Sequence, residues 1–368
     1  MKLTLTQQTL QKALRVVQKS VSTKPQLPIL SCILVKASDK TLSLFSTDLY
    51  TGVTVEIDAE VETPGEFAVP GKYFTQIISS LNSTTLTIEK KDGNVLILAK
   101  DSKTKLVEMD TSEFPEFPQI DPQKNHLPVE EFQQALSRVA FSASSDQTRP
   151  ILTGVLCKFN KDEIQLIATD GFRLAITQLQ AKSEIDQEMI IPAKALVDIL
   201  KTAEEELVKT ITFSVSEALK QVKFEVGAYT FYIRLLEGEY PPYQKIIPTQ
   251  IATKVVCNRQ DLEEKLQRSL IFNQDNSFIT QFTIDKEGVT LFATSPSAGE
   301  YTTKLSDTEV KGSEVVIAFN SRFVLDFLKS FQDDFVTLEI VESLRPARFS
   351  IDSIKDFQYV VMPFRVTT

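Results

Sequence analysis

The sequence predicts an α+β protein made of three tandem copies of one domain, in which two helices cover one face of antiparallel sheets. Three observations lead to this prediction. The chain has 368 residues, which suits two or three domains of roughly 150 residues each. Its first third repeats in its second third without a gap. Each copy also alternates helical apolar periods with short β-branched runs, a pattern typical of helices packed on one face of an antiparallel sheet.

The repeat is clearest between the first and second copies, which align at a constant shift of 122 residues. Pro28–Leu30 falls on Pro150–Leu152, and Thr47-Asp48 falls on Thr169-Asp170. The third copy follows more loosely, because one of its loops is shorter. The predicted domains are 1–122, 123–248 and 249–368.

Each copy is expected to contain a strand, a helix, several strands, a second helix and further strands. The first helix is recognised in copy one by apolar residues at positions 10, 13, 14 and 17. Alternating runs such as Val53, Val55 and Ile57 predict strands. The second helices are expected over 72–81, 194–206 and 322–331. Two proline-rich stretches with aromatic residues, 113–118 and 239–243, predict semi-rigid joints between the copies.

The composition leaves little room for catalysis. His126 is the only histidine, and the sequence contains no Cys-x-x-Cys, Gly-x-Gly-x-x-Gly, Walker or Gly-x-Ser-x-Gly motif. Gly makes up 11 of the 368 residues, well under the usual ~7%, so loops that cradle phosphate are scarce. The chain therefore has few residues suited to catalysis, and we expect no bound cofactor or metal.

The cysteines and the hydropathy pattern indicate where the protein works. Cys32, Cys157 and Cys257 are far apart and lie in apolar-rich stretches, which indicates buried free thiols in a reducing compartment. No apolar run approaches the ~18 residues of a membrane span. The N-terminal stretch lacks the apolar block of a signal peptide. We expect a cytoplasmic protein that does not associate with membranes.

The chain is acidic, with a net charge of −9, yet basic residues recur on the predicted helices of all three copies. A protein this acidic does not coat nucleic acid with its whole surface, but it can present one basic face. The spacing of Lys12, Arg15 and Lys19 places them together on one helical face. Ordinary solvated helical faces are the alternative explanation. The cations on these helices that could form such a face toward nucleic acid are Lys12, Arg15, Lys19, Lys72, Arg138, Lys194, Lys201, Lys265 and Arg322.

The segment Thr169–Leu174, TDGFRL, stands between two alternating runs, and its Asp-Gly predicts a hairpin turn. Asp48 is equivalent to Asp170 in the repeat, so we expect both carboxylates to cap a turn. The residues that follow Asp170 differ from those of copy one, which suggests a role beyond folding. Plain packing between domains is the alternative.

Three tandem copies, the segments Leu27–Leu30 and Thr169–Leu174, and the ending Val360–Arg365 together resemble the bacterial β sliding clamp family, the processivity subunits of DNA polymerase III. The resemblance covers the whole chain. It implies a homodimeric ring of six similar domains, closed head to tail, with helices lining the hole and sheets outside. Duplex DNA would pass through without sequence-specific contacts, an ATP-driven clamp loader would open the ring, and polymerases and repair proteins would dock on it.

The same resemblance implies three sets of site residues. A hydrophobic cleft between domains two and three would bind short peptides that carry Gln and spaced Leu or Phe side chains, with Arg173 orienting the peptide. The cleft would be formed by Leu152, Thr169, Gly171, Phe172, Arg173, Leu174, Pro241, Lys245, Ile246, Val360, Met362, Pro363, Phe364 and Arg365. Loop contacts with DNA would come from Lys24 and from the stretch containing Asp146, Gln147 and Arg149. The dimer interface would use Leu106 on one side and Ile271 and Phe272 on the other.

Two departures from the family pattern fall in the predicted cleft. Phe172 stands where many members have His, and Phe364 stands where Met is common. Both changes make the cleft richer in aromatic surface, so we expect a shifted peptide preference with the same mode of binding.

Two other functions are open at this point. The first is a hydrolase that uses Asp48 or Asp170 with a metal ion, although neither residue has a carboxylate partner at helical or strand spacing. The second is a scaffold of repeated α+β domains that does not bind DNA.

Overall fold

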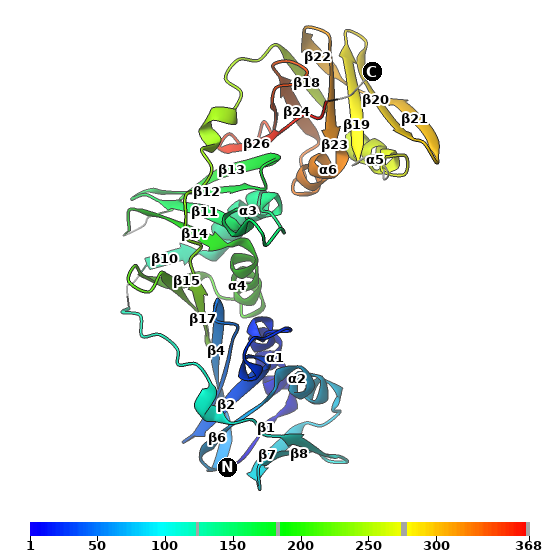
Figure 1. Ribbon diagram of the computed structural model, residues 1–368. Helices are drawn as coiled ribbons and strands as arrows, with labels where there is room; N and C mark the ends of the chain where they lie inside the picture. Colours follow the sequence, from blue (N-terminus) through cyan, green and yellow to red (C-terminus); the bar gives the residue numbers. More distant parts are fainter. Residues whose placement is uncertain (123–124, 182–184, 274–277, 366–368) are drawn as a thin grey trace. The chain divides into compact units, whose positions relative to one another are not determined.

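A computed structural model of the chain describes residues 1–122, 125–181, 185–273 and 278–365 (Figure 1). Position 123, where the second predicted domain begins, and the last residues of the third, 366–368, lie outside these ranges. The chain divides into two compact units: Met1–Val129 with Ala195–Leu235, and Glu130–Lys194 with Leu236–Thr368. The division runs through the second predicted copy, because each unit contains a sheet that continues from one copy into the next.

All three copies follow the predicted order of strand, helix, strands, helix and strands, which confirms the α+β repeat. The first copy contains β1 (Lys2–Thr6), α1 (Gln7–Val17), β2 (Cys32–Ser38), β3 (Thr41–Thr47), β4 (Thr51–Asp58), β5 (Glu60–Thr63), β6 (Gly65–Pro70), α2 (Gly71–Ser80), β7 (Thr85–Lys91), β8 (Asn94–Leu98) and β9 (Lys103–Val107). The second contains β10 (Asn125–Pro128), α3 (Val129–Val139), β11 (Gly154–Phe159), β12 (Glu163–Thr169), β13 (Arg173–Gln180), β14 (Gln187–Pro192), α4 (Ala193–Glu205), β15 (Thr210–Ser216), β16 (Gln221–Val226) and β17 (Tyr229–Arg234). The third contains β18 (Thr253–Asn258), α5 (Arg259–Ser269), β19 (Ile279–Asp285), β20 (Gly288–Ser295), β21 (Gly299–Lys304), β22 (Glu309–Gly312), β23 (Val315–Asn320), α6 (Ser321–Lys329), β24 (Phe335–Ile340), β25 (Ala347–Ser350) and β26 (Phe357–Val361).

In the first unit, one sheet joins copies one and two. Its eight strands run in the order β10-β15-β16-β17-β4-β3-β2-β6. The joint is the antiparallel pair β4 and β17, where Gly52 lies opposite Tyr232. A five-stranded sheet of copy one, β5-β1-β7-β8-β9, completes the unit and leaves β9 at an edge.

In the second unit, a nine-stranded sheet joins copies two and three in the order β14-β11-β12-β13-β26-β25-β24-β18-β22. The joint is again an antiparallel pair, β13 and β26, where Leu174 lies opposite Val360. A four-stranded sheet of copy three, β21-β20-β19-β23, leaves β21 at an edge. The same kind of joint is therefore made twice, once in each unit.

Capping side chains fix where several helices begin. Thr6 Oγ1 accepts a hydrogen bond from the backbone N–H of Thr9 in α1 (3.2 Å), and Asn258 Oδ1 accepts one from Asp261 in α5 (3.0 Å). Helix α1 buries the apolar stripe that the sequence predicts. Burial of one such Leu or Val side chain contributes about 1.5–3 kcal/mol. In each unit the helices lie on one face of the sheets (Figure 1).

All three cysteines are free and buried, as the sequence predicts. Burial raises the pKa of the Cys157 thiol well above its ordinary range, and it raises the pKa of Cys257 to about 12. Both thiols therefore stay protonated near neutral pH and act as small apolar core groups. Among the described residues, no helix combines the length and apolar character needed to cross a membrane.

Candidate functional site

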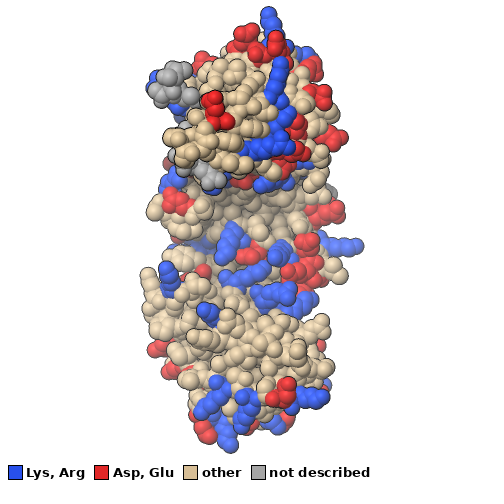
Figure 2. All heavy atoms as spheres, turned by 90° about the vertical axis from the view of Figure 1, so that its right-hand side faces the viewer, with Lys and Arg blue, Asp and Glu red and all other residues tan. Residues whose placement is uncertain are grey.

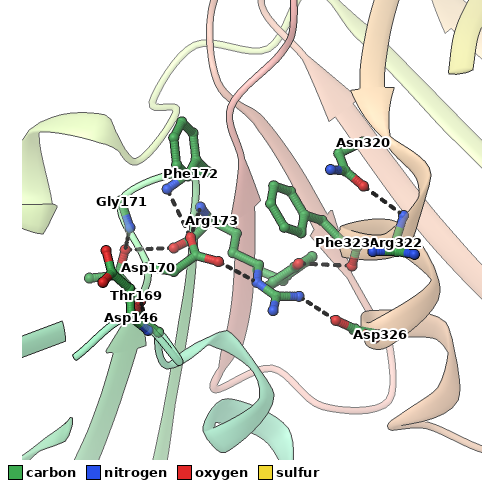
Figure 3. Close-up of polar contacts among 12 residues, drawn as sticks. Asp146, Thr169, Asp170, Gly171, Phe172, Arg173, Asn320, Arg322, Phe323 and Asp326 are labelled. Carbon is green, nitrogen blue, oxygen red and sulfur yellow. Dashed lines mark hydrogen bonds and ion pairs between the residues drawn. The ribbon is translucent and has the colours of Figure 1, made fainter. Parts of the chain in front are cut away.

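The turn that follows β12 is capped by its aspartate, as predicted. Asp170 Oδ1 accepts hydrogen bonds from the backbone N–H groups of Phe172 (2.9 Å) and Arg173 (3.0 Å) (Figure 3). In copy one, Asp48 Oδ1 accepts the equivalent pair from Tyr50 (2.9 Å) and Thr51 (2.7 Å). Both carboxylates are thus used by the fold.

The residue after each aspartate adopts a left-handed backbone conformation. In copy two this residue is Gly171, with a φ of 94°, and in copy one it is Leu49, with a φ of 73°. Glycine adopts this conformation without strain, whereas a leucine side chain does not. The glycine of copy two therefore relieves strain in the turn. The next side chain, Phe172, is 49% exposed.

Arg173 is the most heavily engaged side chain of the segment. Its Nε donates to Asp170 Oδ2 (2.9 Å), and its Nη1 donates to Asp326 Oδ2 in α6 (2.6 Å) (Figure 3). The guanidinium also lies over the Phe323 ring, 4.6 Å from its centroid, and near Phe141, at 5.7 Å. Cation–π contacts of this kind add to the two ion pairs.

Burial alone would lower the pKa of Arg173, but the Tyr359 hydroxyl and the carboxylates of Asp326 and Asp170 outweigh that effect, and the pKa stands above its ordinary value. The guanidinium is permanently charged and held by two acids. These contacts fasten the hairpin of copy two to α6 of copy three. The expected role of Arg173 in orienting a bound peptide stays a prediction.

A buried apolar cluster adjoins these ion pairs. Leu174 and Val360 belong to one buried core cluster, and Ile246 from the joint packs against it. The backbone N–H of Met362 donates to the Phe172 carbonyl (2.9 Å), and that of Phe364 donates to the Ala318 carbonyl (2.8 Å). The structure therefore brings the end of the chain beside the TDGFRL turn, as the sequence analysis expects.

The remaining predicted cleft residues differ in exposure. Leu152 is buried, and so is Thr169, whose hydroxyl donates to the Arg173 carbonyl (2.6 Å). Pro241 and Pro363 are half-buried, whereas Lys245 and Arg365 are exposed. The exposed and half-buried members are those that a ligand can reach. The sequence analysis missed Asp326 and Phe323, since both lie on α6, about 150 residues from their partner Arg173.

The equivalent joint of copy one is built differently. Gly52 stands where copy two has Leu174, and a Cβ atom there would lie 2.5 Å from the Phe117 ring. Phe117 packs against Tyr232 (centroids 5.1 Å apart) and Phe45 (5.7 Å). The linker's own aromatic ring thus covers this position in copy one. The side-chain arrangement around TDGFRL is specific to the second joint.

The predicted DNA-contacting cations fall into three groups. Arg15, Lys24, Lys72, Lys194 and Lys201 are exposed. Figure 2 shows Lys and Arg side chains gathered on the helix-bearing side, at the level of α1 and α4, with Asp and Glu side chains beside them. The helix-bearing side is thus cationic in part, although the chain as a whole is acidic.

A second group of cations is partly neutralised by ion pairs. Lys12 Nζ lies 2.9 Å from Glu206 Oε1, and Lys19 Nζ lies 3.2 Å from Asp198 Oδ1. Arg149, the third member, pairs through Nε with Asp146 Oδ2 (3.1 Å). These pairs lower the net positive potential that the residues offer.

The third group is constrained by burial or packing. Arg138 is half-buried, and burial lowers its pKa while Asp333 opposes this effect. The Arg322 guanidinium lies 3.3 Å from the Phe278 ring centroid. The Lys265 side chain is only 13% exposed, pairs with Asp261 (2.6 Å) and donates to the Lys304 carbonyl (2.8 Å). Lys265 therefore contributes less to a cationic surface than its place in the sequence suggested.

Nothing in the described ranges supports metal chemistry. They contain no group of three or more His, Cys, Asp or Glu side chains that could hold a metal ion. Asp48 and Asp170 cap turns, and Asp170 also pairs with Arg173. The two aspartates that a metal-dependent hydrolase would have to use are therefore engaged by the fold.

Known proteins share this domain order along the whole chain. Models of the N-terminal, central and C-terminal domains of the DNA polymerase III beta subunit match residues 1–118, 126–242 and 244–365. The chain is 30% identical over 390 residues to the beta sliding clamp of Synechocystis sp., with 100% of both proteins covered. It is 27% identical over 379 residues to the beta sliding clamp of Streptomyces coelicolor, again with 100% of both covered. The crystal structure of the DNA polymerase III beta subunit from Thermotoga maritima matches with a TM-score of 0.93 at 26% identity, covering 100% of each chain.

Proposed function

The chain belongs to the DNA polymerase III β-subunit family, the non-catalytic β sliding clamps, and from this premise we propose that two copies close head to tail into a ring around duplex DNA. The ring tethers the replicative polymerase and other DNA-processing proteins to the DNA. We propose the domain boundaries 1–122, 123–248 and 249–368 for the three clamp domains of each protomer. We also propose a cytoplasmic location, which the three buried free thiols support.

The sheet order is the observation that carries the ring proposal. β4 pairs with β17, and β13 pairs with β26. β4 of copy one and β13 of copy two are equivalent strands, and their equivalent in copy three is β21. β17 of copy two and β26 of copy three are likewise equivalent, and their equivalent in copy one is β9. In the described chain, both of these strands lie at the edge of a sheet. Pairing β21 of one protomer with β9 of another would make the same joint a third time and cover both edges, as a closed head-to-tail dimer requires.

Apolar side chains beside both edges support this arrangement. Val107 on β9 is 69% exposed, and Ile271 at the end of α5 is 62% exposed. Phe272 stacks on Tyr301 of β21, with ring centroids 5.7 Å apart, so the helix end and the edge strand form one surface. Leu106 lies half-buried on β9. Large apolar side chains exposed in this way are typical of a surface that a partner covers.

Because the proposed ring encloses the DNA, its contacts with DNA do not need to be tight. A closed ring retains DNA by topology, so its contacts can be weak and independent of sequence. Exposed cations such as Arg15 on α1, Lys72 on α2 and Lys24 in a loop offset the repulsion between DNA and an acidic protein. We expect an affinity for short linear duplex in the range typical of non-specific binding, roughly 10⁻⁴–10⁻⁶ M, with strong salt dependence.

The surface formed by the TDGFRL turn, the 241–246 joint and residues 360–365 is our proposed docking site. Its ligand would be a peptide of the type Gln-x-x-Leu-x-Phe from a polymerase, the clamp loader or a repair protein. Exposed Phe172 and half-buried Met362 and Ile246 supply apolar contacts, and Met side chains adapt to different partners. Lys245 and Arg365 add positive charge at the rim.

Molar mass in solution tests the ring directly. Light scattering at micromolar concentration should give about twice the chain mass of 41.3 kDa. Ile271→Glu should convert the dimer to a folded monomer, because it places a charge in an apolar interface. A wild-type protein that is monomeric under these conditions would contradict the ring, and would leave the DNA-free scaffold as the better function.

A further inference from the structure

A polar pocket lies between α1 and α2 of copy one. Its volume is about 220 Å³. The residues that line it are Gln11, Arg15, Gln18, Lys19, Thr75 and Ser79. All six side chains are polar, two are cationic, and no carboxylate is among these lining residues. A wall of this kind favours an anion with several oxygen atoms.

Two of the polar atoms at this pocket are buried without a hydrogen-bond partner. Thr75 Oγ1 is one, and Lys19 Nζ is the other. Lys19 Nζ lies 3.2 Å from Asp198 Oδ1, which is within ion-pair distance but not in hydrogen-bond geometry. The Asp198 carboxylate therefore attracts the ammonium group but does not satisfy it as a hydrogen-bond donor. Buried polar groups in proteins are normally hydrogen-bonded, so these two atoms indicate a missing acceptor.

The repeat provides an internal control for this pocket. The equivalents of Lys19 are Phe141 in copy two and Ile271 in copy three. The equivalents of Thr75 are Val197 and Phe323. The fold therefore accommodates apolar side chains at both positions. Polar residues at both positions in copy one alone point to a ligand and not to a requirement of the fold.

We propose that this α1–α2 pocket binds one phosphodiester group of the DNA that the ring encloses. The inference rests on the proposed function. Arg15, which is exposed, and Lys19 pair with the non-bridging phosphate oxygens, and the Thr75 hydroxyl donates a hydrogen bond to one of them. The pocket lies between two helices of the cationic helix-bearing side, where the backbone of enclosed DNA passes. The pocket gives each protomer one defined phosphate contact, in addition to the long-range electrostatic attraction between the other cations and DNA.

The key variant is Thr75→Val, because it removes the hydroxyl without changing charge or shape. Purified dimer is titrated with a short fluorescent duplex over a range of NaCl concentrations. We expect Thr75→Val to weaken duplex binding about 3- to 10-fold with an unchanged salt slope. Arg15→Gln should weaken binding and also reduce the slope of log K against log salt by about 0.9, the value for one lost phosphate contact. A Thr75→Val dimer that binds duplex as tightly as wild type would overturn the proposal.

Lys72→Gln is the matched control for the phosphate measurement alone, since Lys72 is an exposed cation on α2 that does not line the pocket. Inorganic phosphate is the second probe. Phosphate should raise the melting temperature of the wild type and of Lys72→Gln, but not that of Thr75→Val or Arg15→Gln. If phosphate stabilises the wild type while duplex affinity does not respond to Thr75→Val, the pocket serves a free anion and its assignment to DNA is overturned.

A different set of results would contradict the proposed function itself. A protein that is monomeric, or that does not bind duplex at all, would contradict the ring whatever phosphate does. A dimer that binds duplex with equal affinity in wild type and Thr75→Val would contradict only the pocket. Melting temperatures and molar masses of all variants establish that each comparison is made between folded dimers.

Discussion

Replacing Phe172 with Ala should weaken peptide docking without disturbing the fold. Phe172 is 49% exposed and follows the left-handed Gly171 at the tip of the TDGFRL turn. A Phe side chain buries roughly 200 Å² when fully covered, so about 100 Å² is available to a ligand here. If a peptide covers half of this area, the lost contact amounts to ~1.2 kcal/mol at about 25 cal/mol per Å². That energy corresponds to a roughly eightfold weaker Kd.

The assay is fluorescence anisotropy with a labelled peptide of the Gln-x-x-Leu-x-Phe type. Tyr50→Ala is the matched control, because Tyr50 holds the equivalent position in copy one and is 66% exposed. We expect wild type and Tyr50→Ala to bind alike and Phe172→Ala to bind about eightfold more weakly. Equal losses in the two variants, or no loss in Phe172→Ala, would refute the docking assignment. Unchanged melting temperatures verify that both variants are folded.

Three further predictions concern the end of the chain, the second joint and the acid response. Removing residues 362–368 should abolish peptide binding, as measured by anisotropy, while light scattering still reports a dimer. Asp326→Asn should loosen the joint between copies two and three by about 1–2 kcal/mol, between the values typical of exposed and buried ion pairs, because Asp326 is 42% exposed and Arg173 is 10% exposed. Hydrogen exchange should then be faster in β13 and β26, and unchanged rates would contradict this role. Hydrogen bonds from Lys36 and Thr111 lower the pKa of Glu66, so the stability it contributes is present above its ordinary pKa of 4.5 and is lost as pH falls below that value. Melting temperatures between about pH 5 and 3 should therefore fall less steeply in Glu66→Gln than in wild type.

The fold could be predicted from local sequence patterns because the same patterns occur in more than one copy of the domain. The gap-free shift from Pro28–Leu30 to Pro150–Leu152 revealed the copies. The equivalence of Asp48 and Asp170 identified both as turn caps, and the hydrogen bonds to the following backbone amides confirm it. Turn capping depends on residues two or three positions apart, so it can be inferred from short segments.

Contacts between distant segments could not be predicted in this way. Arg173 in copy two pairs with Asp326 in copy three, and no short-range sequence pattern specifies that partner. Lys12 and Lys19 were expected to share one helical face with Arg15, but the sequence did not indicate that Glu206 and Asp198 would lie beside them. The pairing of β4 with β17 and of β13 with β26 is likewise set by tertiary packing, because strand partners depend on which edges the folded copies bring together.

Retention on circular DNA tests the central claim, enclosure of duplex DNA by a closed ring, most directly. Labelled protein is loaded onto a nicked circular plasmid by a bacterial clamp loader and ATP, and the complex is passed through a gel-filtration column. We expect the protein to remain with the circle at moderate salt and to be released when a restriction enzyme cuts the plasmid once. Equal retention on circular and linear DNA would show that binding and not topology holds the protein, and would contradict the account.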